Sequence, residues 1–411
     1  MTASAKPKPI GASALSKLFQ PPFGPLIFLV IVCVIFTVLP LLQGKDNRFF
    51  TPQNFALIFQ QTAVVGVLAI GQTLVILTSG IDLSNGLIMA LTSVIVAGMA
   101  VHGFSFESGG SVFSLLNAII LAMIVAVIGY FSSSVGLRNT SNVAPTIRRF
   151  APFVIAGAAA VVFYALEPGG AVSPFVALLI GVLVAGFAGF INGTLVTRLK
   201  LPPFIVTLGT LNIVFALTRI YTTSTINGLP EPLLALGQTL VFYTGKLQEN
   251  GNPEELFRVP LYAIVMLLLF FLVWFILRET KLGRHIYAVG DNKEAAELVG
   301  IPVNRILLIV YTSAGVLYGI AAILLIARQE NGDPQAGQTS NLESITAVVL
   351  GGTSLFGGRG HIMGTLIGAL VVSVIRNGLT QAGANPIIQT LITGILVIAA
   401  VAIDQFSQRA K

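Results

Sequence analysis

Uncharged polar side chains inside apolar stretches are the residues of this chain whose types and spacing suit solute recognition. Gln61 and Gln72 are eleven residues apart, close to three helical turns, so both face one side of the helix expected there. Asn192 lies in a later apolar stretch. Amides and hydroxyls donate and accept hydrogen bonds, which suits a neutral, hydroxyl-rich solute such as a sugar. The same groups also hydrogen-bond neighbouring helices, and for any single residue that interpretation is at least as good.

Two apolar runs break off into glycines and hydroxyl residues. The first breaks into TSGIDLSNG at 78–86 and the second into GGTSLFGG at 351–358. Non-helical backbone at membrane depth is tolerated only where protein or a watery cavity surrounds it. Paired interruptions in the two halves of a chain indicate a translocation path. The residues that we predict to border this path are Gln61, Gln72, Asp82, Ser84, Asn85, Asn192, Thr353 and Ser354.

Acids deep in a membrane span would indicate coupling to protons or sodium ions. Asp82 and Glu343 are the candidates, and both lie near the breaks, where capping a helix N-terminus is the simpler explanation. An ion-coupled secondary sugar carrier therefore stays open as the alternative function.

Motifs for catalysis and metal binding are missing from the sequence. There is no G-x-x-x-x-G-K-[ST], H-E-x-x-H, C-x-x-C or G-x-S-x-G. The three histidines, His102, His285 and His361, are far apart in the chain. We therefore expect no enzyme activity, no bound metal and no cofactor in this chain.

The composition is that of a polytopic membrane protein. Of 411 residues, 55% are hydrophobic and only 9% charged, far outside the range of soluble domains. The single cysteine, Cys33, excludes a disulfide framework. The net charge of +7 comes from basic residues in short loops, which is typical of membrane topology signals and not of a nucleic-acid surface.

The apolar runs predict an all-α polytopic membrane protein with about 10–12 transmembrane helices, some of them broken or short. We expect spans near 26–42, 56–78, 86–101, 112–131, 150–166, 173–195, 203–221, 259–277, 306–326, 344–355, 361–376 and 386–403. Lysines and arginines gather in alternate loops, which places the tails 1–25 and 404–411 in the cytoplasm. The same rule places the loop 278–305 inside and the acidic loop 222–258 outside, within a membrane domain that covers 26–403.

The loop 278–305 contains a short helix whose ends the sequence predicts. Asp291 is expected as the N-cap, with Glu294 completing a capping box. Gly300 is the expected C′ glycine, and Pro302 prevents the helix from continuing. Apolar side chains recur at helical spacing between these ends, at Ala295, Leu298 and Val299. Because so short a helix is marginal alone, it either docks on another protein or is a turn in a solvated loop.

Glycines at four-residue spacing mark faces where helices approach closely. They are Gly360, Gly364 and Gly368, and in an earlier span Gly189 and Gly193. We expect these faces to pack within the chain and not to form a dimer.

Four stretches together resemble the permease subunits of binding-protein-dependent ABC importers, in the ribose/xylose/galactose branch. They are ILTSGIDLSNG (76–86), INGTLVTRLKLPPFIVTLGT (191–210), KLGRHIYAVGDNKEAAELVGIPVNRI (281–306) and LESITAVVLGGTSLFGGRGHIMGTLIGAL (342–370). The resemblance implies a type II-like permease fold in the bacterial inner membrane. It also implies a pair of permeases, two cytoplasmic ATPase subunits that bind ATP and Mg²⁺, and a soluble periplasmic sugar-binding protein.

The resemblance assigns the short helix as the coupling helix that docks on the ATPase. The residues concerned are Gly290, Asp291, Asn292, Glu294, Ala295, Ala296, Leu298, Val299 and Gly300. We expect Ala296 to be small because the helix enters a cleft of the ATPase. The chain departs from the family at Asn85, often valine there, at Asn341, often glutamate, and in a longer region at 104–172.

The function expected from these observations is that of a permease subunit that imports a monosaccharide and performs no chemistry. The ion-coupled carrier is disfavoured because it would not need a capped cytoplasmic helix, and a scaffold or sensor would leave the broken helices unexplained. Ribose, xylose, galactose and fructose all remain compatible with the sequence.

Overall fold

The computed structural model describes residues 23–42, 49–103, 172–247 and 253–409, and most of these are helical. In this part of the chain, eight helices are long and apolar enough to cross a membrane. They are α2 (Phe23–Leu42), α3 (Pro52–Leu77), α4 (Asn85–His102), α7 (Pro174–Arg198), α8 (Pro203–Tyr221), α10 (Leu261–Glu279), α13 (Val303–Gln329) and α15 (Ile362–Gln381). The shorter α14 (Ser340–Leu350) and the C-terminal α16 (Pro386–Arg409) complete the membrane domain.

Ten of the twelve predicted spans fall on described residues, and each coincides with one of these helices. The predicted spans 112–131 and 150–166 lie outside the described residues. Local signals place several helix starts. Proline occupies the first turn of α3, α7 and α8, where its missing N–H costs no hydrogen bond. The hydroxyl of Thr51 accepts from the Asn54 N–H and so caps α3.

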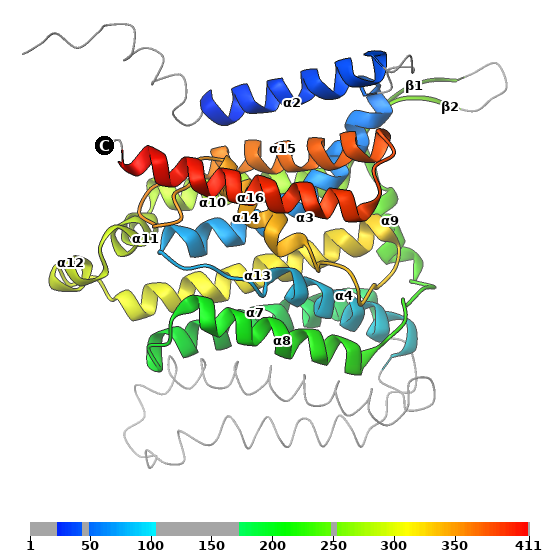
Figure 1. Ribbon diagram of the computed structural model, residues 1–411. Helices are drawn as coiled ribbons and strands as arrows, with labels where there is room; N and C mark the ends of the chain where they lie inside the picture. Colours follow the sequence, from blue (N-terminus) through cyan, green and yellow to red (C-terminus); the bar gives the residue numbers. More distant parts are fainter. Residues whose placement is uncertain (1–22, 43–48, 104–171, 248–252, 410–411) are drawn as a thin grey trace, which may run out of the picture.

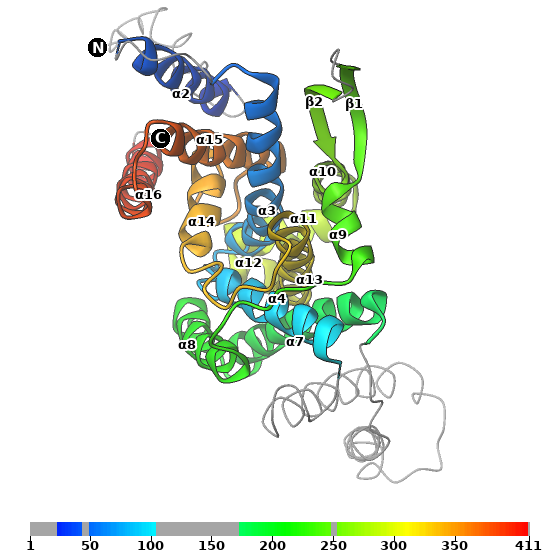
Figure 2. The ribbon, with the colours of Figure 1, turned by 90° about the vertical axis from the view of Figure 1, so that its right-hand side faces the viewer.

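Helices α3 and α13 lie in the middle of the molecule (Figures 1 and 2). Helices α7 and α8 cover one side, and α2, α15 and α16 cover the opposite side. The core contains Phe270, Tyr311 and Tyr318, whose side chains are fully buried. Large apolar side chains on the outer helices are exposed, among them Phe175, Leu268 and Ile398. Apolar side chains on the outer surface as well as in the core are typical of a protein whose helices face lipid.

Small residues allow the closest helix crossings. A Cβ atom on Gly189 of α7 would lie 2.2 Å from the Tyr311 carbonyl oxygen of α13, and one on Gly315 would lie 2.4 Å from the Ala185 oxygen. A Cβ atom on Gly368 of α15 would meet the Ala347 carbonyl oxygen of α14, and one on Gly364 would meet that of Gly351, the residue after α14. The glycine faces therefore pack within the chain, as predicted. Gly360 is the exception, because it precedes α15 and is not part of the helix.

The two ends of the molecule differ (Figure 1). One end carries α11 (Lys281–Asp291) and α12 (Lys293–Leu298), together with the C-terminus of α16. The other end carries α9 (Glu231–Gln238) and an antiparallel hairpin of β1 (Leu240–Leu247) and β2 (Pro253–Pro260). The hairpin was not predicted, since the region 222–258 was interpreted only as an acidic loop. Its two strands pair from Leu240 opposite Pro260 to Leu247 opposite Pro253.

Candidate functional site

The first break contains a network of buried polar side chains at the start of α4. The backbone N–H and hydroxyl of Ser84 donate to Asp82 Oδ1, at 2.8 and 2.6 Å. Asn85 Nδ2 donates to Ser344 Oγ of α14 at 2.7 Å and to Gln72 Oε1 of α3 at 3.1 Å. All five side chains are fully buried. The network therefore joins three helices around the non-helical backbone of the break.

The network continues into α7 and α8. Asn192 Nδ2 donates to Ser84 Oγ at 3.1 Å, and Asn192 Oδ1 accepts from the Thr210 hydroxyl at 2.6 Å. Five of the eight residues predicted to border a path thus lie in two neighbouring hydrogen-bonded groups, with Asp82, Ser84 and Asn192 in one and Gln72 and Asn85 in the other. Because the partners are all within the protein, replacing Asn85 by valine would leave buried groups unpaired and cost stability as well.

The other three predicted residues lie elsewhere. Gln61 is on α3 and only partly buried. Thr353 and Ser354 are buried in the second break, where the Ser354 N–H donates to the Arg359 carbonyl oxygen at 2.9 Å.

The two breaks contact each other and the end of α11. The Gly358 N–H of the second break donates to the Leu77 carbonyl oxygen at the end of α3, at 3.0 Å. The Ser79 hydroxyl lies 2.8 Å from the carbonyl oxygens of both Phe356 and Gly290. A Cβ atom on Gly290 would lie 1.7 Å from the Leu77 oxygen, so only glycine fits there. The two breaks and the loop 278–305 therefore meet at one end of the molecule.

Tyr287 adds a further contact between α11 and the second break. Its hydroxyl donates to the Gly360 carbonyl oxygen at 2.9 Å. Gly357 and Gly358 have φ of 85° and 68°, in the left-handed region that favours glycine. Ser79 also lies in that region, at φ 60°. The junction is thus built from tight backbone turns that hydrogen bonds hold together.

Helix α12 exists, but its N-cap differs from the prediction. Asp291 is the last residue of α11, and Asn292 is the cap, with its Oδ1 accepting from the Ala295 N–H at 2.9 Å. Glu294 then occupies the second helical position, so no capping box forms. Both Asp291 and Asn292 are good caps, and the continuation of α11 through Asp291 decides between them.

The C-terminus of α12 confirms the prediction for Gly300, which has φ 84°. The Gly300 N–H donates to the Glu297 oxygen and the Ile301 N–H to the Ala296 oxygen, both at 3.0 Å. These two bonds form a Schellman motif.

The burial of Ala296 contradicts the predicted reason for its small side chain. That residue is only 3% exposed and packs into the core of its own chain. Its small size is therefore explained by packing within this protein and not by a cleft of a partner. Leu298 and Val299 are 89% and 76% exposed. They are exposed apolar side chains at the C-terminal end of α12.

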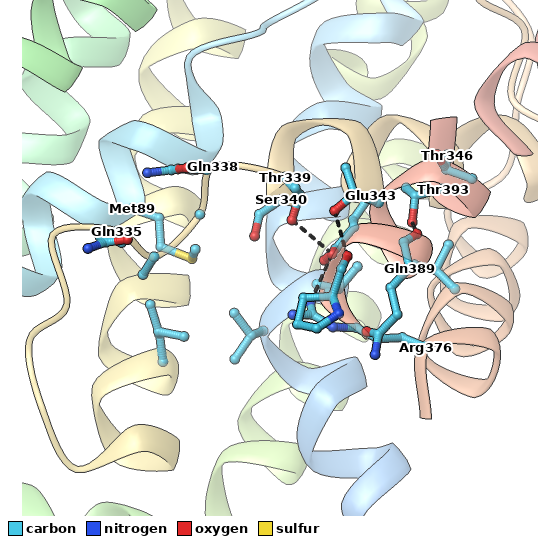
Figure 3. Close-up of a pocket in the computed structure, with 18 of the residues that line it drawn as sticks. Met89, Gln335, Gln338, Thr339, Ser340, Glu343, Thr346, Arg376, Gln389 and Thr393 are labelled. Carbon is cyan, nitrogen blue, oxygen red and sulfur yellow. Dashed lines mark hydrogen bonds and ion pairs between the residues drawn. The ribbon is translucent and has the colours of Figure 1, made fainter. Parts of the chain in front are cut away.

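A polar cavity of about 330 Å³ lies at the opposite end of α13 (Figure 3). That end is marked by the contact of Gln238 on α9 with Glu330, at 3.3 Å. Polar and charged residues from the end of α13, from the loop after it and from α14, α15 and α16 line it, among them Arg328, Gln329, Asp333, Gln335, Gln338, Thr339, Ser340, Glu343, Thr346, Arg376, Gln389 and Thr393. None of the eight predicted path residues lines this cavity.

An ion pair crosses the cavity wall. Arg376 Nη1 donates to Glu343 Oε1 at 2.8 Å, and the Thr339 hydroxyl lies 3.3 Å from the same oxygen. Glu343 thus pairs with Arg376. The role predicted from the sequence, capping the N-terminus of a helix, is not the one observed. For Asp82, the expected capping interaction is present, since its carboxylate accepts from the Ser84 N–H at the start of α4. The sequence feature that could have indicated this cavity is the presence of two opposite charges, Glu343 and Arg376, within apolar segments.

These features define a multi-pass membrane protein with broken helices, of the kind that moves solutes. Residues 150–401 match the sequence model of the family described as branched-chain amino acid transport system / permease component. The chain belongs to this family of ABC importer permease subunits.

Full-length relatives support the assignment. The chain is 38% identical over 391 residues to the fructose import permease protein FrcC of Rhizobium meliloti, covering 95% of this chain and 87% of the relative. It is 33% identical over 382 residues to the ribose import permease protein RbsC of Bacillus subtilis, covering 93% and 92%. It is 29% identical over 389 residues to the D-allose transport system permease protein AlsC of Escherichia coli, covering 94% and 93%. No solved structure matches the chain.

The chain is therefore a multi-pass permease of the bacterial inner membrane and part of an ABC importer. Membership in this family implies ATPase and substrate-binding protein partners. The alternative of an ion-coupled carrier is not supported.

Proposed function

We propose that this permease imports a monosaccharide. The observation that carries the proposal is the cavity in Figure 3, whose wall presents amides and hydroxyls around the Glu343–Arg376 ion pair, with one further charge of each sign on Arg328 and Asp333. Its volume of about 330 Å³ lies at the lower end of the range of small-molecule sites. A solute with many hydroxyls and no charge would find a partner for most of its polar groups there. The names of the relatives, which import fructose, ribose and allose, agree with this choice.

In the proposed orientation, the end with α11 and α12 is cytoplasmic, together with both chain termini. Exposed basic residues support this, since Arg284 and Arg305 flank α12 at this end. The cavity would then open toward the outside, where a soluble binding protein releases the solute.

The proposed complex contains two copies of this chain and two ATPase subunits. The chain itself would carry out no reaction and would hold no cofactor, with ATP and Mg²⁺ bound by the ATPase subunits. Leu298 and Val299 support docking of α12, because exposed apolar side chains on a short helix gain stability when a partner covers them.

The contacts of α11 explain how docking would reach the path. Movement of α12 would shift α11, and the bonds from Ser79 and Tyr287 would pass that shift to both breaks. The polar network behind the first break connects it to α7, α8 and α14, so the helices around the path would move together.

Transport by the reconstituted importer tests the proposal. Proteoliposomes that contain this permease, its ATPase and its binding protein should accumulate a monosaccharide only when ATP is supplied. Fructose, ribose, xylose, galactose and leucine are compared as labelled solutes. Accumulation of leucine without any monosaccharide would assign the chain to amino-acid import. Uptake by the permease alone under a proton or sodium gradient would contradict the ATP-driven mechanism.

A further inference from the structure

Glu343 has a carboxylate that its own protein satisfies on one side only. Its Oε1 accepts from Arg376 and lies near the Thr339 hydroxyl, whereas Oε2 is buried and has no hydrogen-bond partner among the described residues. Only 4% of the residue is exposed. Leaving an acceptor on a charged group buried and unpaired is costly. A group from outside the chain that donates to Oε2 would remove this cost.

Arg376 leaves hydrogen-bond donors free beside this carboxylate. Its side chain is 45% exposed even though Nη1 donates to Glu343. A guanidinium group carries five N–H donors in a fixed fork, so one bond leaves others available. Both residues line the same cavity (Figure 3). The pair therefore presents an acceptor and donors side by side.

We infer that Glu343 and Arg376 bind two adjacent hydroxyls of a neutral polyol. One hydroxyl donates to Glu343 Oε2, and its neighbour accepts from the Arg376 guanidinium. This inference rests on the proposed function and makes the pair the specificity-determining element of the cavity.

The cavity wall carries two charges of each sign, on Glu343, Asp333, Arg328 and Arg376, and at the Glu343–Arg376 pair these charges favour a neutral diol over an amino acid. Glu343 and Arg376 already neutralise each other at 2.8 Å. A zwitterion would have to compete with that attraction on both sides, whereas a diol uses the sites that the pair leaves open. The nearby Thr346, Gln389 and Thr393 are uncharged and add hydrogen-bonding groups without favouring a charge.

Binding of sugars to the purified full-length permease tests this assignment. Its thermal stability is measured against increasing D-ribose and D-fructose, because a ligand that binds the folded state raises Tm. Glu343→Gln and Arg376→Gln should each raise the concentration for half of the maximal shift by about tenfold or more, since a hydrogen bond to a charged group contributes about 1.5–3 kcal/mol. Glu330→Gln removes an exposed charge at the same end, outside the cavity, and should leave binding unchanged.

Deoxy sugars separate recognition from support of the fold. An analogue that lacks one hydroxyl of the bound diol should bind the native protein about tenfold more weakly than the parent sugar. The Glu343→Gln variant should bind the analogue and the parent sugar with nearly the same affinity. If Glu343→Gln fails to fold, Glu343→Asp keeps the charge but withdraws the carboxylate by one methylene, and its ranking of parent and deoxy sugars should change. If the pair only joins α14 to α15, the Glu343 variants should have a lower Tm and an unchanged ranking of parent and deoxy sugars. That result would overturn the inference.

Two results separate this inference from the proposed function. Uptake of leucine and no monosaccharide by the native importer would contradict the proposed function itself. Uptake of a monosaccharide that is the same in native, Glu343→Gln and Glu330→Gln importers would contradict only the role of the pair. A native permease that no sugar stabilises would also count against the pair as a binding site.

Discussion

The Ser79 hydroxyl lies 2.8 Å from the Gly290 carbonyl oxygen, which joins the first broken helix to the helix that precedes α12. The same hydroxyl lies 2.8 Å from the Phe356 oxygen in the second break. A serine has one hydroxyl proton, so it shares this proton between the two carbonyl groups or alternates between them. Ser79 is therefore a side chain through which a displacement of α11 reaches both breaks.

Replacing Ser79 should weaken the coupling of ATP hydrolysis to uptake. Ser79→Gly is the informative change, because glycine tolerates the φ of 60° and only the hydroxyl is lost. A lost hydrogen bond of about 1 kcal/mol predicts a fall of about fivefold in solute moved per ATP hydrolysed. Lys200→Gly, an exposed position with φ 53° at the end of α7, is the matched control and should leave this ratio unchanged. An unchanged ratio in Ser79→Gly would exclude this link.

Leu298 should determine docking of the ATPase without affecting the fold of the permease. Its side chain is 89% exposed, so Leu298→Asp should change the permease's own stability by no more than about 0.5 kcal/mol. Covering a leucine contributes about 1.5–3 kcal/mol, so docking should weaken at least tenfold. Co-purification with the ATPase subunit measures this. Leu199→Asp replaces another exposed leucine, at the end of α7, and should retain the ATPase. Full retention in Leu298→Asp would refute docking through this face.

Ala296→Asp should damage the permease itself. The side chain is buried in its own chain, so an aspartate there is desolvated without a partner and costs several kcal/mol. Loss of uptake in this variant should be accompanied by a lower Tm and by faster hydrogen exchange in α12. A normal Tm combined with a lost ATPase contact would instead mean that Ala296 faces the partner.

The crossing of α7 and α13 should tolerate no added atom. Gly189→Ala places a Cβ 2.2 Å from a backbone carbonyl oxygen, so it should cost about 1–3 kcal/mol or more, seen as a lower Tm in detergent. Gly209→Ala is the control, since nothing lies within 4 Å of a Cβ there. Alanine favours a helix over glycine by up to about 1 kcal/mol, so this second variant should be neutral or more stable. Equal Tm values for the two variants would contradict the close crossing.

Tyr287 should make the junction sensitive to alkaline pH. Burial raises the pKa of its phenol above 10.0, the ordinary value that also applies to the unfolded chain. The neutral hydroxyl donates to Gly360, so its contribution to stability is fully present below pH 10 and is lost as the pH rises through the folded-state pKa. Tyr287→Phe should therefore lower stability by about 0.5–1.5 kcal/mol at neutral pH. As the pH rises through the folded-state pKa, the advantage of the native protein in denaturant unfolding should be lost or reversed, because a buried phenolate is costly and phenylalanine does not titrate. A native protein that stays more stable than the variant there by the same amount would exclude the hydrogen bond as the cause.

Local sequence signals were sufficient for most of the helices. An apolar run long enough to span a membrane predicts a helix wherever it occurs, because lipid offers no other partner for the backbone. Gly300 was predicted for the same kind of reason, since a left-handed C′ position favours glycine and is set by the residues next to it. The glycine faces of α7 and α15 could also be predicted, because a side chain is excluded wherever two backbones touch.

Only the tertiary structure could decide between neighbouring candidate residues or show which side chains of different helices are in contact. Asp291 and Asn292 are equally good caps in sequence, and only the continuation of α11 selected Asn292. Ala296 and Leu298 are both apolar, but the packing of α12 against α13 turned one inward and left the other exposed. Glu343 and Arg376 lie 33 residues apart on different helices, and no local pattern pairs them. Sequence determines which segments become helices because that choice depends on neighbouring residues. Which side chains meet depends on how the helices cross, and this only the folded chain decides.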